Sequence, residues 1–176
     1  MKKKLLLIAA SFVFTVCIFA QPVQQKVSDK LTVTFPGKPE EQKPAGDAGP
    51  AIYSYSKDSS TSYMAMSYDL SPMGLTAEAI AAAGDGLWDQ MKSGMTQQMA
   101  GAIITKDEKA KYKDTDAYFL EIDGATSTAP QLKGKKAFVY VFFIGSNLHQ
   151  VAFYSAKKDA KVEDGKDFFD SAVIAK

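Results

Sequence analysis

Apolar and polar residues alternate along several short stretches of this chain, and this alternation predicts half-buried β-strands. The stretches are residues 31–35, 51–56, 61–70, 103–112, 117–122, 135–144 and 148–156. Short polar turns, such as residues 57–60 and 145–147, separate neighbouring stretches. Successive strands joined in this way are expected to pair antiparallel.

Two further stretches repeat their apolar residues at helical spacing. The first follows Thr76, a good N-terminal cap, and is predicted to be one helix to about residue 100, with Trp88 on its apolar face. The second, residues 159–175, is predicted to be a closing helix that presents Phe169. We expect Trp88 and Phe169 to be buried, holding the two helices against the sheet.

This order of elements indicates the α+β class, with a central antiparallel sheet of about six to seven strands and helices packed on it. The polar residues 21–29 are interpreted as a flexible leader, and residues 36–50, rich in proline, glycine and charge, as a loop. Residues 30–176 are then expected to form a single domain.

The N-terminus has the order of a secretory signal peptide over residues 1–20. Lys2, Lys3 and Lys4 precede an apolar run that ends at Ala20 and is too short to span a bilayer. We expect cleavage after Ala20 and export to the periplasm or the extracellular space, with no membrane span. Lipidation of Cys17 is the less favoured alternative, because the bulky Val16 precedes it.

Composition narrows the classes of partner and chemistry. The chain has 21 basic residues, all lysine, and 20 acidic residues; loss of the three leader lysines leaves 18 against 20. The absence of arginine and the near-neutral charge argue against nucleic acid as a partner. Cys17 is the only cysteine, so the processed domain would have no disulfide and no thiolate metal site.

Two short motifs carry a family resemblance. Residues 33–39, Val-Thr-Phe-Pro-Gly-Lys-Pro, resemble the entry segment of bacterial PsbP-like domains, and residues 167–171, Asp-Phe-Phe-Asp-Ser, complete the likeness near the C-terminus. The resemblance implies an α-β-α sandwich around a twisted antiparallel sheet, a fold shared with the Mog proteins. Plant and cyanobacterial members are extrinsic subunits of photosystem II, but nothing in this sequence connects the chain with photosynthesis.

Candidate chemistry is sparse. His149 is the only histidine, and a hydrolase would have to use it with a nucleophile such as Ser146 or Ser155. One histidine without a processed cysteine is a poor zinc set, so no metal site and no cofactor are predicted. A structural role for His149 is favoured.

The acidic residues and methionines have alternative interpretations that do not require a site. The acidic sets are expected to be solvated surface; they are Asp85 with Asp89, Asp114 with Asp116, and Glu163 with Asp164 and Asp167. The methionine stripe could suit Cu(I) but is more typical of core packing; it comprises Met91, Met95 and Met99, with Met64, Met66 and Met73 elsewhere. Tyrosines on the strands could line a ligand cleft, although cross-strand packing is favoured; these are Tyr53, Tyr55, Tyr63 and Tyr68.

Three function hypotheses follow. The first is an exported, non-catalytic binding or assembly module whose partner the sequence does not name. The second is a carrier for a small apolar ligand, with a pocket between helix and sheet. The third is a hydrolase using His149, which requires a nucleophile within hydrogen-bond reach.

Overall fold

The computed structural model describes residues 21–42 and 49–175, so the predicted signal peptide and Cys17 lie outside the described residues. Two antiparallel sheets form the framework. The larger sheet has the order β3 (Glu40–Gln42), β4 (Ala51–Ser56), β5 (Thr61–Asp69), β9 (Asn147–Ser155), β8 (Lys136–Ile144), β7 (Thr115–Asp123) and β6 (Ile103–Tyr112). The smaller has the order β1 (Val23–Lys26), β2 (Leu31–Phe35) and β10 (Val173–Ile174).

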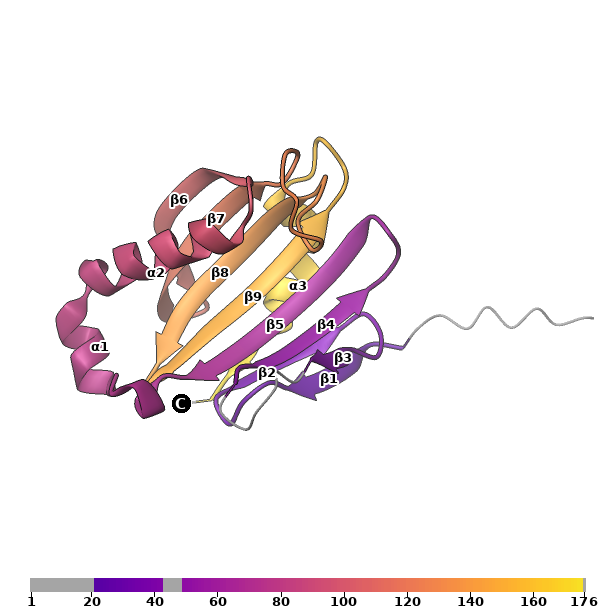
Figure 1. The fold of residues 1–176 in the computed structure, drawn as a ribbon. Coiled ribbons are helices and arrows are strands. Elements are labelled where there is room, and N and C mark those ends of the chain that lie inside the picture. Colours follow the sequence, from indigo (N-terminus) through magenta and orange to yellow (C-terminus); the bar gives the residue numbers. More distant parts are fainter. Residues whose placement is uncertain (1–20, 43–48, 176) are drawn as a thin grey trace, which may run out of the picture.

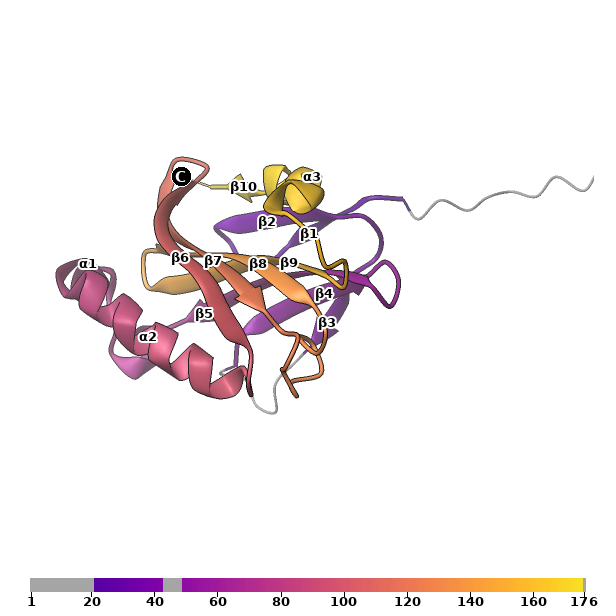
Figure 2. The ribbon, with the colours of Figure 1, turned by 90° about the horizontal axis from the view of Figure 1, so that it is seen from above.

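The helices cover the two faces of the larger sheet, which confirms the α+β class predicted from the sequence. The long arm of α1 (Ala77–Ala83) and α2 (Asp85–Gln98) lies over one face, preceded by a 3₁₀ turn, η1 (Ser71–Met73). The small sheet and α3 (Lys166–Asp170), which follows a second turn, η2 (Val162–Gly165), lie over the other face. Figures 1 and 2 show this three-layer arrangement from two sides.

Each face of the larger sheet has its own apolar core, because successive side chains of a strand point to opposite faces. Along β8, Phe138 and Phe142 join the core beneath the small sheet and α3. Val139 and Val141 join the core beneath α1 and α2. Trp88 and Phe169 are 3% and 5% exposed, so the predicted burial of both is confirmed.

The interpretation of residues 21–29 as a flexible leader missed the strand β1. Val23 lies opposite Phe35, and β1 pairs with β2 along its whole length. The polar residues Gln24 and Lys26 are exposed, so this edge strand packs against the protein through its other face only. The predicted loop over residues 36–50 also contains the short strand β3, while residues 43–48 lie outside the described part of the chain.

The predicted single helix over residues 76–100 is two helices. Thr76 caps the first as expected, with its hydroxyl accepting from the Ala79 backbone N–H. The break is at Gly84, whose φ of +51° and ψ of −130° interrupt the helix. Glycine permits this backbone conformation because it has no Cβ.

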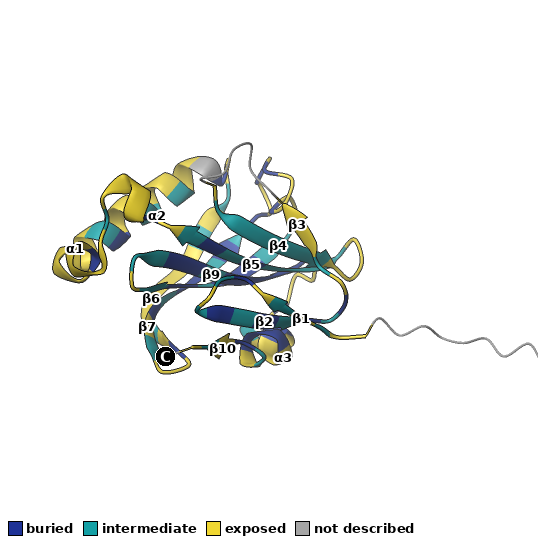
Figure 3. Ribbon diagram, turned by 90° about the horizontal axis from the view of Figure 1, so that it is seen from below, coloured by how far each residue is buried: buried dark blue, intermediate teal, exposed yellow. Residues whose placement is uncertain are grey.

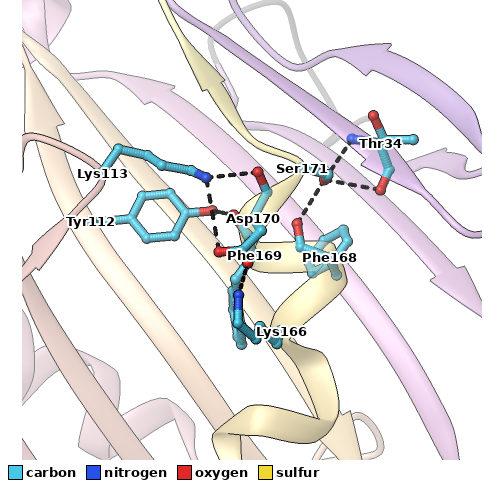
Figure 4. Close-up of polar contacts among 8 residues, drawn as sticks. All are labelled: Thr34, Tyr112, Lys113, Lys166, Phe168, Phe169, Asp170 and Ser171. Atoms are coloured by element: carbon cyan, nitrogen blue, oxygen red, sulfur yellow. Dashed lines mark hydrogen bonds and ion pairs between the residues drawn. The ribbon is translucent and has the colours of Figure 1, made fainter.

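The predicted closing helix over residues 159–175 is wrong in extent. The segment forms η2, the five-residue α3 and then β10, which pairs with β2 through Val173 and Thr32. Contacts with other elements end α3 early, as Figure 4 shows. The hydroxyl of Ser171 donates to the Phe168 carbonyl at 2.7 Å and accepts from the Thr34 backbone N–H at 3.0 Å.

Two side chains from the β6–β7 hairpin complete the end of α3. The phenol of Tyr112 donates to the Phe169 carbonyl at 2.9 Å, and Lys113 Nζ donates to the Asp170 carbonyl at 2.7 Å. Figure 4 shows both contacts. The last carbonyls of a helix lack partners within the helix, and these bonds add donors there; the Phe169 carbonyl also accepts a longer bond from the Ala172 backbone N–H at 3.4 Å.

The Pro36–Gly37 turn explains one residue of the N-terminal motif. A Cβ built on Gly37 would lie 2.5 Å from the ring of Tyr55, which packs directly against the turn. Any side chain at this position would displace that ring. The glycine of the motif therefore allows the connection between β2 and β3 to pack closely on Tyr55 of β4.

Candidate functional site

A cleft of about 660 Å³ lies between the α1–α2 arm and the part of the sheet formed by β6, β7 and the end of β8. We call it the arm cleft. It is lined by Ala77, Ile80, Ala81, Gly84, Asp85, Leu87, Lys109, Ala110, Thr115, Asp116, Ala117, Tyr118, Phe142, Phe143 and Gly145. Ile80, Leu87 and Phe143 give it an apolar wall on the arm side, whereas the side chains of Ala110, Ala117 and Phe142 belong to the core on the opposite face of the sheet.

The helical wall of the arm cleft comes from the inner side of α1 and the first turn of α2. Ile80 is the buried residue of α1, while Ala77 and Ala81 are exposed. Leu87 on α2 and Phe143 on β8 are half-buried and pack against the apolar core beneath the arm. Figure 3 shows that most of α1 faces solvent. The cleft thus joins an exposed arm to the edge of the core.

Three polar side chains from three elements meet at one end of the arm cleft. Asp85, at the start of α2, accepts from Lys109 Nζ at 2.8 Å and from the Tyr118 hydroxyl at 2.7 Å. The bond from Lys109, followed by the bond from Tyr118, lowers the pKa of Asp85. Desolvation first, and then the bond to Asp85, raises the pKa of Tyr118 to about 12. The group is an ionised carboxylate held by an ammonium and a protonated phenol.

The same tyrosine is fixed by the core. The ring of Tyr118 stacks on the indole of Trp88, with centroids 4.1 Å apart and an interplanar angle of 9°. The face of Tyr118 is therefore held by Trp88, and its hydroxyl by Asp85 three residues earlier in α2. These contacts set the position of the arm over β7.

His149 lies away from the arm cleft lining and is completely buried on β9. Its ring stacks on Phe142 with centroids 5.3 Å apart, and its cross-strand neighbours are Phe142 and Ser67. Neither ring nitrogen has a hydrogen-bond partner. Desolvation lowers the pKa of His149 to about 4, so the ring is neutral at pH 7.

The serines considered with His149 have other partners. Ser146 Oγ bonds to Asp69 at 3.2 Å, and Ser155 Oγ accepts from the Lys157 backbone N–H at 3.3 Å. No nucleophile of the described residues is within hydrogen-bond reach of His149. The requirement set above for a hydrolase is not met by this geometry.

Two of the other acidic candidates lie in surface ion pairs. Asp116 pairs with Lys111 at 2.6 Å, and Asp89 lies 3.6 Å from Lys92. Within residues 21–42 and 49–175, no group of three or more His, Cys, Asp or Glu side chains could hold a metal ion. Asp85 and Asp116 are the acidic candidates that reach the arm cleft.

The methionine stripe of α2 packs on the sheet. Met99 is buried, and Met91, Met95, Met64 and Met66 are half-buried in the same apolar cluster. Met73 is 63% exposed, on the turn that precedes α1. Thus all of these methionines except Met73 help to attach the arm.

Of the tyrosines of β4 and β5, Tyr53, Tyr55 and Tyr63 pack on the opposite face, whereas Tyr68 packs against the core beneath the arm. Tyr63 contacts Tyr55, Phe153 and Phe168, with ring centroids 5.0–6.3 Å apart.

The sequence pointed to Asp85 as a candidate residue but not to Lys109 or Tyr118. Their contacts with Asp85 join residues that lie 24 and 33 positions apart, and no local pattern reports such a pairing.

The comparisons with known proteins address the fold. No protein-family model and no curated protein matches the chain. The structure is similar to the solution structure of cyanobacterial PsbP (CyanoP) from Synechocystis sp. PCC 6803, with a TM-score of 0.56 and 15% sequence identity, covering 92% of this chain and 96% of that one. None of the described helices is both long and apolar enough to cross a bilayer. The chain has a PsbP-like α+β fold.

Proposed function

We propose that this protein is an exported, non-catalytic binding protein, and that a small, largely apolar molecule held in the arm cleft is its ligand. The observation that carries the proposal is the cleft of about 660 Å³ between an exposed helical arm and the sheet, with an apolar wall of Ile80, Leu87 and Phe143 and one polar end. Small-molecule sites are typically concave, about 300–1,000 Å³ in volume, and apolar with a few placed polar groups.

The non-catalytic part of the proposal is supported by the surroundings of the reactive candidates. His149 is buried without a hydrogen-bond partner. Asp85 is held in its charged form by Lys109 and Tyr118, which makes it a poor proton acceptor. The export part rests on the order of basic and apolar residues at the N-terminus.

A matched pair of variants on α1 tests the site. Ala81 lines the arm cleft, whereas its neighbour Ala82 is exposed on the same helix and does not line it. Ala81→Trp should fill the cleft, and Ala82→Trp should add the same indole outside it. We expect Ala81→Trp to weaken binding of the uncharged dye Nile red at least tenfold, with Ala82→Trp close to wild type.

The natural ligand can be sought with the same variants. The exported form is purified under native conditions and its copurifying molecules and proteins are identified together by mass spectrometry. A small molecule present with wild type and Ala82→Trp, but absent from Ala81→Trp, supports the proposal. If Ala81→Trp binds dye and cellular molecules as well as wild type does, the cleft is not the binding site. A protein partner retained by all three forms would favour an assembly module.

A further inference from the structure

The charges at the arm cleft are paired within the protein. Its lining contains three charged side chains, Asp85, Lys109 and Asp116. Lys109 Nζ lies 2.8 Å from Asp85 Oδ2, and Asp116 pairs with Lys111 at 2.6 Å. No charged side chain of the lining therefore lacks an opposite charge. The cleft offers a ligand polar contacts without a free counter-charge.

This pairing disfavours an ionic ligand. A charged group that enters the arm cleft loses part of its hydration, and burial of a charge is costly unless it gains a charged or hydrogen-bonded partner. To obtain such a partner, an anion would have to separate Lys109 from Asp85. A cation would have to displace Lys109 from the same carboxylate. An uncharged ligand leaves the pair intact.

An uncharged hydrogen-bonding group lies beside the paired charges. The phenol oxygen of Tyr118 donates to Asp85 and keeps acceptor capacity. Ile80, Leu87 and Phe143 supply an apolar wall on the same face of the sheet. The site therefore combines an apolar wall with a polar group suited to a hydroxyl or similar head.

We infer that the ligand is an uncharged amphiphile, with its alkyl or aromatic body against Ile80, Leu87 and Phe143 and a hydroxyl-type head beside Tyr118. This inference rests on the proposed function, since it assigns a ligand class to the same cleft.

Three probes with the same twelve-carbon chain and different head charges test it at pH 7 and physiological salt. They are 1-dodecanol, laurate and dodecylamine, which are uncharged, anionic and cationic under these conditions. Each is used below its aggregation limit to displace Nile red from the full chain. We expect dodecanol to bind at least tenfold more tightly than either ion. Ala81→Trp has the same charge as wild type, so any binding it retains is subtracted as non-specific.

Two variants then test the role of the ion pair. Asp85→Asn leaves Lys109 without its carboxylate and should improve laurate binding relative to dodecanol. Lys109→Met leaves Asp85 without its ammonium and should improve dodecylamine binding instead. Each change is expected to be roughly threefold to fivefold, as for partly exposed charge pairs. Because one variant should favour the anionic probe and the other the cationic probe, the comparison distinguishes an effect of charge from a general loosening of the arm.

The outcomes separate this inference from the proposed function. If no probe binds in a manner sensitive to Ala81→Trp, the cleft is not a site and both proposals fail. Binding that is blocked by Ala81→Trp but tightest for laurate or dodecylamine overturns the uncharged class alone. The same holds if the three probes bind equally, or if the two variants change ion binding in the same direction.

Discussion

The indole of Trp88 lies flat on the phenol ring of Tyr118, with centroids 4.1 Å apart and planes 9° from parallel. The hydroxyl of that tyrosine donates to Asp85 at 2.7 Å. Tyr118 of β7 thus contacts two residues of α2, Trp88 and Asp85. The arm that borders the cleft is attached to the sheet through this arrangement.

Trp88→Ala is predicted to lower the free energy of unfolding by about 3–5 kcal/mol, the usual cost of truncating a buried aromatic residue. Trp88 is 3% exposed and is the only tryptophan, so denaturant unfolding is followed by circular dichroism. Tyr118→Phe keeps the ring stack and removes only the bond to Asp85, and should cost about 1 kcal/mol or less. Equal losses in the two variants would contradict the dominant role of the stack.

Tyr112→Phe is predicted to destabilise the protein by about 0.5–1.5 kcal/mol, because the Phe169 carbonyl loses its 2.9 Å bond and keeps the longer bond from the Ala172 backbone N–H at 3.4 Å. Phe169→Ala should cost more, about 3–5 kcal/mol, since it empties part of the core. Thermal and urea unfolding measure both. An unchanged stability of Tyr112→Phe would mean that water replaces the phenol at the end of α3.

His149 is predicted to make the protein sensitive to acid. Its pKa falls from 6.5 to about 4 on burial, so the unfolded chain binds the proton more readily. The stabilisation is fully present above about pH 6.5 and decreases as the pH falls towards 4, by about 3 kcal/mol in total. His149→Leu should lose this part of the pH dependence in urea unfolding between pH 7 and 4.

Ligand binding provides the control for that variant. Because His149 does not line the arm cleft, His149→Gln and His149→Leu should bind Nile red at pH 7 as wild type does. Loss of binding or of a stoichiometric metal in either variant would assign His149 a functional role. An unchanged slope of stability against pH in His149→Leu would show that other groups cause the acid sensitivity.

Two helix glycines are predicted to respond oppositely to alanine. A Cβ at Gly84 or at Gly94 meets nothing within 4 Å, so space does not distinguish them. Gly94→Ala should stabilise the protein by about 0.5–1 kcal/mol through helix propensity. Gly84→Ala should destabilise it by about 1–3 kcal/mol, because φ is +51° there. Stabilisation by both would mean that α1 and α2 can merge into one helix.

The exported form is predicted to begin at or near Gln21 without a lipid. Intact mass spectrometry of protein from the cell envelope and the culture medium tests this. A diacylglyceryl mass on Cys17, or retention of Lys2, Lys3 and Lys4 in a membrane fraction, would overturn it.

The sequence predicted the elements whose signals are local. The strand over residues 51–56 was placed at its observed bounds, because alternation and flanking turns both lie within it. The closing helix was overextended, because the contacts of Ser171 with Thr34 join opposite ends of the chain. The polar end of the arm cleft was missed for the same reason: Tyr118 and Lys109 meet Asp85 only after the sheet has formed.

The order of strands also determines when the molecule can be completed. In the larger sheet, Thr61 of β5 pairs with Ser155 of β9, and in the smaller sheet Thr32 of β2 pairs with Val173 of β10. Pairings between residues so distant in the chain form slowly, because a large loop must close before they contribute. During synthesis, β2 and β5 can pair early with β1 and β4, but they gain their second partners only after β10 and β9 have been made. Completion of both sheets therefore depends on residues far from the strands that they join.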